Sequence, residues 1–212
     1  LPMSYLWAWD YYKIGTSNNW TPEEVPLMDD IEQWKTNEIP ENIKRLVLWN
    51  LGFFSTAESL TGNNIVLAIY QHITNPEIRC ALIRQSLEEI IHTASFVYCC
   101  DTFGFDPNSI YTMYQTIPSI KNKDDFVLNL TKSVFNRDFE IKTDKDIQNF
   151  LRDLIGFFCI MEGIFFYAGF AMMLSLKRQN ILTGIGQIFE YILRDESMHL
   201  SLGIDIINTI KK

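Results

Sequence analysis

Two copies of one short motif constrain this 212-residue chain more than any other feature. Glu89-Ile90-Ile91-His92 and Glu196-Ser197-Met198-His199 each place a glutamate three residues before a histidine. On a helix, this spacing puts both side chains on one face, one turn apart. A carboxylate and an imidazole that point at the same place are typical ligands of a first-row metal ion. Because the chain has only three histidines, the two motifs indicate two ligand-bearing helices.

A lone glutamate in an apolar segment precedes each motif. Glu58 lies in Leu51-Gly52-Phe53-Phe54-Ser55-Thr56-Ala57-Glu58-Ser59-Leu60, and Glu162 follows Phe157-Phe158-Cys159-Ile160-Met161. A buried carboxylate without a counter-charge is costly, so both acids need a cation. Four helices would then direct four carboxylates and two imidazoles inward, which is the arrangement of ferritin-like dinuclear metal carboxylate proteins. The predicted metal ligands are Glu58, Glu89, His92, Glu162, Glu196 and His199.

Hydrophobic periodicity predicts an all-α, ferritin-like helical bundle that forms a single domain over residues 1–212. No segment has the alternation of a strand, and a hydrophobic content of 47% is enough for a packed core. Residues 1–20 have no clear pattern and are expected to be irregular. The expected helices cover about 21–35, 40–73, 76–103, 144–176 and 182–210, with shorter helices and polar loops between 108 and 146.

Charge and cysteine content exclude several classes of protein. A net charge of −8 argues against nucleic-acid binding. Residues 154–176 are apolar enough for a membrane span, but Glu162 near their middle favours a buried bundle helix, so we expect no membrane insertion. The four cysteines lack zinc-site spacing and are expected to be free thiols in the cytoplasm.

The motifs together resemble the small, radical-generating subunit of class I ribonucleotide reductase. The resemblance covers nearly the whole chain and implies the same six metal ligands. It also implies a homodimer that works with a separate large, catalytic subunit. It rests on Trp20-Thr21-Pro22-Glu23-Glu24-Val25, Phe54-Ser55-Thr56-Ala57-Glu58-Ser59, Glu89-Ile90-Ile91-His92, Met161-Glu162-Gly163 and Arg194-Asp195-Glu196-Ser197-Met198-His199.

The chain departs from the usual family pattern at two positions. The family commonly has a radical-bearing tyrosine four residues after the first metal histidine, where this chain has Phe96. Glu58 stands where tyrosyl-radical members commonly have aspartate. Both departures resemble the chlamydial-type class Ic subgroup, in which a manganese–iron pair stores the oxidising equivalent; an iron–iron pair is the alternative. Tyr98 is two positions further along the helix and is expected to face elsewhere.

The resemblance also implies a path for the electron. Trp20, Asp195 and His92 match the family's relay from the metal site towards the surface. Tyr191 matches a tyrosine that helps deliver an electron during cofactor assembly in this subgroup, although it could equally be a core tyrosine. Glu88 is expected to be solvated or paired with an arginine. His72 is expected to be a surface or capping residue.

Function follows from the resemblance. The metal pair would react with O2 and oxidise a cysteine of the large subunit, which reduces ribonucleotides. The competing reading is a stand-alone ferritin-like metal oxidase or a metal-storage protein. Family members continue well beyond the second motif, whereas this sequence stops at Lys212. We therefore expect a C-terminally truncated chain that assembles the cofactor but supports little nucleotide reduction.

Overall fold

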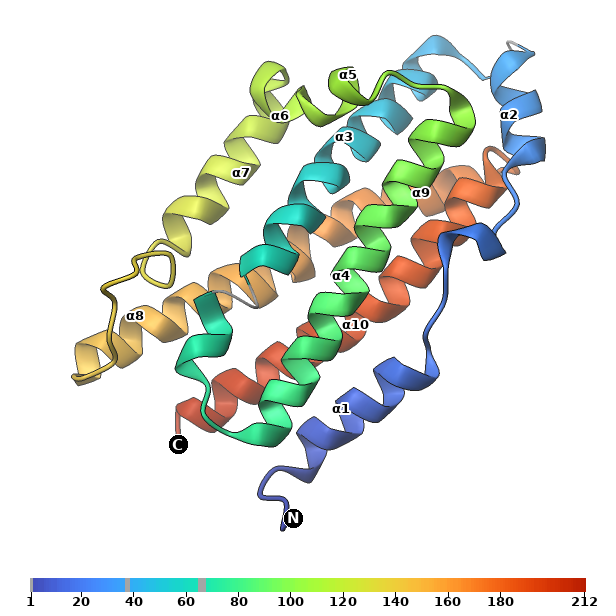
Figure 1. Ribbon diagram of the computed structural model, residues 1–212. Helices are drawn as coiled ribbons and strands as arrows, with labels where there is room; N and C mark the ends of the chain where they lie inside the picture. Colours follow the sequence, from blue (N-terminus) through green and yellow to red (C-terminus); the bar gives the residue numbers. More distant parts are fainter. Residues whose placement is uncertain (1, 37–38, 65–67) are drawn as a thin grey trace.

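The computed structural model describes residues 2–36, 39–64 and 68–212, and over these residues it contains helices and no strands. The bundle is built on four long helical segments (Figure 1). Helix α3 (Glu41–Asn64) packs on α4 (Pro76–Phe103), and α10 (Thr183–Ile210) packs on the helix that precedes it. That preceding helix is continuous over Asp144–Lys177. The predicted all-α, ferritin-like bundle is confirmed.

Local sequence signals set the ends of α4. The Asn75 side chain accepts a hydrogen bond from the Ile78 amide over 2.9 Å, and Pro76 occupies the first turn, where no helical amide is needed. Gly104 ends the helix with a positive φ of 70°, a conformation that glycine adopts without a steric penalty. The predicted limits of this helix are confirmed.

The helix Asp144–Lys177 is not uniformly α-helical. It consists of α8 (Asp144–Leu154), a π-helical segment η4 (Ile155–Phe166) and α9 (Tyr167–Lys177). The whole helix is long and apolar enough to cross a membrane, with a mean hydropathy of 1.8 in its most apolar window, half of which is buried. Glu162 lies within η4 and is fully buried.

The expectation that residues 1–20 are irregular is wrong, because Leu6–Ser17 form helix α1. This helix packs along α4 and α10 (Figure 1). Ala8 is fully buried, and Trp7 and Tyr11 pack one turn apart against the core. Packing against the other helices therefore stabilises a segment whose own apolar pattern is weak.

The helix expected over residues 21–35 is divided in two. Thr21 and Glu24 form a capping box at the short 3₁₀ helix η1 (Pro22–Glu24), and α2 (Met28–Lys35) follows after a break. Pro26 causes the break, since a proline disfavours the helical conformation in the residue before it. Accordingly, Val25 is extended, with φ −104° and ψ 107°.

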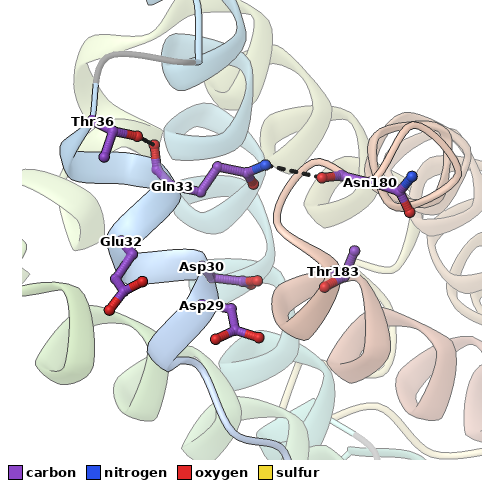
Figure 2. Close-up of a pocket in the computed structure, with 7 residues that line it drawn as sticks. All are labelled: Asp29, Asp30, Glu32, Gln33, Thr36, Asn180 and Thr183. Carbon is purple, nitrogen blue, oxygen red and sulfur yellow. Dashed lines mark hydrogen bonds between the residues drawn. The ribbon is translucent and has the colours of Figure 1, made fainter.

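Side chains of α2 cap the N-terminus of α10. Asp30 Oδ1 accepts from the Gly184 amide over 3.0 Å, and Asp30 Oδ2 accepts from the Ile185 amide over 2.7 Å. Gln33 Nε2 also donates to the Asn180 carbonyl over 2.9 Å (Figure 2). These side chains line an open hollow of about 460 Å³. A cap supplied from another helix is needed here because Leu182, at the cap position, makes no side-chain cap bond.

The remaining elements connect the long helices. The second predicted helix is described up to Asn64, and residues 68–72 beyond it are again helical; the part of that prediction that falls on residues 65–67 lies outside the described residues. His72 is half-buried between the rings of Phe139 and Phe150. The four cysteines are free thiols, as predicted. The other elements are η3 (Tyr70–His72), α5 (Pro107–Tyr111), α6 (Met113–Thr116) and α7 (Pro118–Leu130).

Candidate metal centre

The six predicted ligands converge in the middle of the bundle from four helical segments. They form two overlapping groups, and within each group the ligand atoms lie within 4.8 Å of one another. Glu89 and Glu196 belong to both groups, so each can bridge two ion positions. The groups are Glu58, Glu89, His92 and Glu196, and Glu89, Glu162, Glu196 and His199, all of them buried.

Both histidines direct the same ring nitrogen inward. His92 Nδ1 lies 3.3 Å from Glu58 Oε2 and 3.1 Å from Glu196 Oε1. His199 Nδ1 lies 3.0 Å from Glu89 Oε1 and 3.4 Å from Glu196 Oε1. Nδ1 is therefore the candidate ligand atom in each ring, and Nε2 points away from the cluster.

Burial dominates the electrostatics of the carboxylates. Burial raises the pKa of Glu58 and of Glu162 well above their usual values, and neighbouring carboxylates raise both pKa values further. Burial also pushes the pKa of Glu89 upward, but the charge and hydrogen bond of His199, with further hydrogen bonds from His92 and Glu58, outweigh burial and lower the pKa of Glu89. The cluster is therefore an unfavourable place for four anions unless cations neutralise them.

The pKa values of the two imidazoles are shifted in the direction that favours their charged form. Burial disfavours their charged form, but the surrounding carboxylates raise the pKa values of His92 and His199 well above the usual value. In the absence of an ion, protons on these rings partly balance the acids. A divalent ion would displace those protons, because a metal-binding imidazole must be neutral.

Many of the inward-facing atoms make no hydrogen bond. Buried polar atoms normally have a partner, so unpartnered ones need an explanation. Here they are clustered carboxylate oxygens with an imidazole nitrogen, a donor set that suits iron or manganese. The residues present therefore fit a dinuclear metal site. The unpartnered atoms are Glu58 Oε1, both oxygens of Glu89, Glu162 Oε2, both oxygens of Glu196 and His199 Nδ1.

A second set of contacts leads from His92 towards α1. Asp195 Oδ2 lies 3.3 Å from His92 Nε2 and accepts from Trp20 Nε1 over 2.8 Å. Asp195 is 1% exposed. Burial raises its pKa, but the hydrogen bonds from His92 and Trp20 and the nearby positive charges outweigh burial and lower it. Asp195 is thus held as a carboxylate between two rings, so the structure brings the three residues of the expected relay into contact.

Tyr191 lies beside this chain of contacts. Its ring centroid is 5.1 Å from that of Trp20, and the guanidinium of Arg194 lies 5.5 Å from the Tyr191 ring centroid. Arg194 also donates to Asp195 Oδ1 from Nε over 3.1 Å and from Nη2 over 3.0 Å. Tyr191 therefore packs between Trp20 and Arg194, both of which donate hydrogen bonds to Asp195.

Phe96 lies one turn after His92 in a closed aromatic environment. It is fully buried, and its ring stacks on Phe54 at 5.8 Å with an interplanar angle of 19°. Phe189 is also 5.8 Å from it. Tyr98 faces elsewhere, as expected, and its hydroxyl donates to the Val25 carbonyl over 3.0 Å.

Sequence reasoning missed two contacts that α4 makes with the cluster, one by Glu88 and one by Gln85. Glu88 is 2% exposed and pairs with Arg84, one of the two expected alternatives, but its contact with His199 was not predicted. Gln85, which is 1% exposed, donates from Nε2 to Glu162 Oε1 over 3.0 Å. A signal for Glu88 was present, because an acid precedes both motifs at the same position, Glu88 in one and Asp195 in the other.

Comparisons with known proteins agree with this geometry. The family model described as "Ribonucleotide reductase, small chain" matches residues 1–212. The ribonucleoside-diphosphate reductase subunit beta of Chlamydia pneumoniae is 52% identical over 212 residues, which is all of this chain and 61% of that protein. The chain thus spans about three fifths of the length of this relative.

Solved structures show the same fold. The ribonucleotide reductase R2 subunit from Clostridium botulinum superposes with a TM-score of 0.87 at 32% identity, covering 98% of this chain and 63% of that one. An R2-like ligand-binding oxidase with a Mn/Fe cofactor superposes with a TM-score of 0.78 at 18% identity, covering 96% and 69%, and shows likeness of fold alone. By its full-length match to the family model and its identity to these relatives, the chain belongs to the small-chain family of ribonucleotide reductase.

Proposed function

We propose that this chain is the radical-supplying small subunit of a ribonucleoside-diphosphate reductase, with residues 1–212 as a single ferritin-like domain. The observation that carries the proposal is the pair of overlapping ligand groups that share Glu89 and Glu196. When bound there, a manganese–iron pair would use O2 to supply a strong one-electron oxidant. The proposed ligands are Glu58, Glu89, His92, Glu162, Glu196 and His199.

Phe96 supports manganese–iron over a tyrosyl-radical cofactor. A phenylalanine has no hydroxyl to oxidise, and Phe96 is packed against other aromatic rings. The hydroxyl of nearby Tyr98 is bonded to the Val25 carbonyl. With no phenol at the position that usually carries the radical, a bound metal pair would itself have to hold the oxidising equivalent. The 52% identity to a chlamydial subunit agrees with the chlamydial-type subgroup.

The remaining residues hold the centre and connect it to the outside. Asp195 fixes the ring of His92 and orients Trp20, so Trp20, Asp195 and His92 form the proposed electron path to a large subunit. Tyr191, which contacts Trp20, is the proposed entry point for an electron during cofactor assembly. The aromatic rings around Phe96 exclude water from the oxidising site.

Metal analysis tests the proposal against its alternatives. The metal-free protein is loaded aerobically with Mn(II) and Fe(II), and bound metals are counted and examined by electron paramagnetic resonance. One manganese and one iron per chain is the expected result. Two irons without manganese would support the iron–iron alternative, and many irons per chain would support a metal-storage protein.

A matched pair of variants ties the result to the site. Glu162→Gln removes a charge inside the cluster, and Glu41→Gln removes one from an exposed carboxylate. The first is expected to lose metal and the second to keep it. Equal metal content in both variants would contradict the assigned site.

A homodimer is the proposed assembly. Ile83, Leu87, Ile90 and Val97 are 52%, 46%, 62% and 41% exposed and lie on one face of α4. An uncharged apolar stripe along a helix can pack against its own copy around a two-fold axis. Sedimentation of the wild type is expected to give a dimer, and Ile90→Lys a monomer. A monomeric wild type would contradict this assembly.

A further inference from the structure

The two histidines of the centre are held by acids in a crossed pattern. His92 of α4 contacts Asp195 of α10, with 3.3 Å between Nε2 and Oδ2. His199 of α10 contacts Glu88 of α4, with 2.8 Å between Nε2 and Oε2. Each acid directly precedes the glutamate of one Glu-x-x-His motif, but it contacts the histidine of the other motif. Each long helix therefore orients the ligand carried by its neighbour.

Glu88 is itself held by an ion pair. Its second oxygen, Oε1, accepts from Arg84 Nε over 3.0 Å, and Arg84 Nη1 donates to Asn19 Oδ1 over 3.1 Å. The Arg84 side chain is 8% exposed and that of Glu88 2%. Helix α1 covers the pair, since a Cβ on Gly15 would lie 2.6 Å from Glu88 Oε1. The carboxylate is thus fixed on three sides.

The two acids differ in their second partner, the group that each contacts besides a histidine. Asp195 accepts from the indole of Trp20, so the contacts that start at His92 lead through Asp195 to an aromatic ring. The contacts described for Glu88 are with His199 and Arg84, and the arginine continues to Asn19. The contacts that start at His199 therefore lead to an ion pair. An ion pair can hold a metal-binding histidine in place, but it contains no aromatic ring that could carry an electron.

Geometry shows how Glu88 acts on the centre. A carboxylate at Nε2 favours the tautomer with its proton on Nε2, which leaves the lone pair on Nδ1. His199 Nδ1 lies 3.0 Å from Glu89 Oε1, inside the second ligand group. The negative charge of Glu88 also makes the imidazole a stronger donor.

We propose that Glu88, held by Arg84, is a positioning residue that sets metal affinity at the ion position formed by Glu89, Glu162, Glu196 and His199. This inference rests on the proposed function, since it requires the cluster to bind metal. Asp195 has the same effect on the other position, which contains His92.

Anaerobic titration with Mn(II) tests the proposal, with binding followed by calorimetry and by the resonance signal of free Mn(II). The wild type is expected to bind two ions. Glu88→Gln keeps an oxygen opposite His199 but removes the charge. The double variant Arg84→Met/Glu88→Leu removes the whole pair and leaves no unpaired buried charge. Loss of such a partner typically weakens metal binding about 10–100-fold. We expect an affinity loss of this size for one of the two ions only. The loss should be larger in the double variant than in Glu88→Gln.

Control variants distinguish a positioning role of Glu88 from a general loss of packing around the cluster. Gly15→Ala displaces the pair without removing either charge and is expected to weaken the same ion. Asp195→Asn is expected to weaken the other ion, so combining it with Glu88→Gln weakens both. Thermal unfolding of each metal-free variant shows whether the fold is retained.

Three results would overturn the proposal. The first is unchanged affinity for both ions in the Arg84→Met/Glu88→Leu variant, which leaves the proposed function intact. The second is equal weakening of both ions, which indicates a structural effect. The third is a wild type that binds no Mn(II), which overturns the proposed metal function together with this inference.

Discussion

Trp20 and Asp195 are joined by a buried hydrogen bond of 2.8 Å between the indole Nε1 and Oδ2, although most of the chain separates them. Trp20 is 3% exposed and Asp195 1%. Asp195 Oδ2 also faces His92 Nε2. The bond therefore fixes the segment before η1 onto α10 and, through Asp195 and His92, connects that segment to the carboxylate cluster.

Trp20→Phe tests this link. Phenylalanine keeps an aromatic ring but cannot donate to Asp195, so a buried carboxylate loses a partner at a cost of about 1–3 kcal/mol. We expect urea denaturation of the metal-free variant to show that loss. Binding of two Mn(II) ions should persist, because Trp20 contacts no carboxylate of the cluster that we assign as a ligand. Loss of both ions would show that Trp20 is needed to build the site.

Asp30→Ala tests the capping of α10 by α2. Asp30 accepts from the Gly184 and Ile185 amides, and removing a cap acceptor typically costs about 0.5–2 kcal/mol. Glu32→Ala is the matched control, since Glu32 is an exposed acid of the same helix and lines the same hollow. Thermal unfolding should show a lower midpoint for Asp30→Ala alone. Equal midpoints would contradict a capping role.

The two pairs of candidate ligands on α4 and α10 could be brought together by sequence alone because their signal is local. Glu89 and His92 share one helical face whatever surrounds the helix, and the same holds for Glu196 and His199. The ends of α4 were equally predictable, since a capping asparagine, a following proline and a terminal glycine act within one turn. Neither prediction needed knowledge of tertiary contacts.

Features that depend on packing could not be predicted in this way. Helix α1 packs on α4 and α10, with Trp7 and Tyr11 against the core, whereas its own sequence carries little amphipathic pattern. The π-helical geometry of η4 lies in a nearly uniform apolar run that has no period to read. Glu88 was expected to be solvated or paired with an arginine; it does pair with Arg84, but its contact with His199 depends on how α10 packs against α4.

Gly203→Ala tests the close approach of α10 and η4, which carry three of the proposed ligands. An added Cβ would lie 2.5 Å from Cβ of the buried Phe158, too near its backbone to be relieved by a rotamer change. Alanine gains about 1 kcal/mol of helix propensity, but overpacking costs about 1–3 kcal/mol or more. We expect a net loss of about 1–2 kcal/mol in urea denaturation. The control Asn208→Ala lies on an exposed part of the same helix and should show no loss.

Asp124→Asn tests a pH dependence that lies outside the metal centre. Burial, with a smaller contribution from Asp125, raises the pKa of Asp124 on α7 to about 6, and its Oδ2 makes no hydrogen bond. A carboxyl whose pKa is higher in the folded state contributes stability below its unfolded pKa of 3.8. That contribution is lost as the pH rises through about 6. Asparagine cannot ionise, so the variant avoids the loss.

The gain in unfolding free energy from Asp124→Asn should therefore be smallest near pH 4 and rise towards pH 7. Because Asp124 is only partly buried, solvent screening limits the gain to about 1 kcal/mol. Urea denaturation of the metal-free protein across this range measures it. The control Asp138→Asn, at an exposed carboxylate, should give a difference that does not change with pH. A gain that is the same at both ends of the range would mean that Asp124 ionises as freely in the folded chain as in the unfolded one.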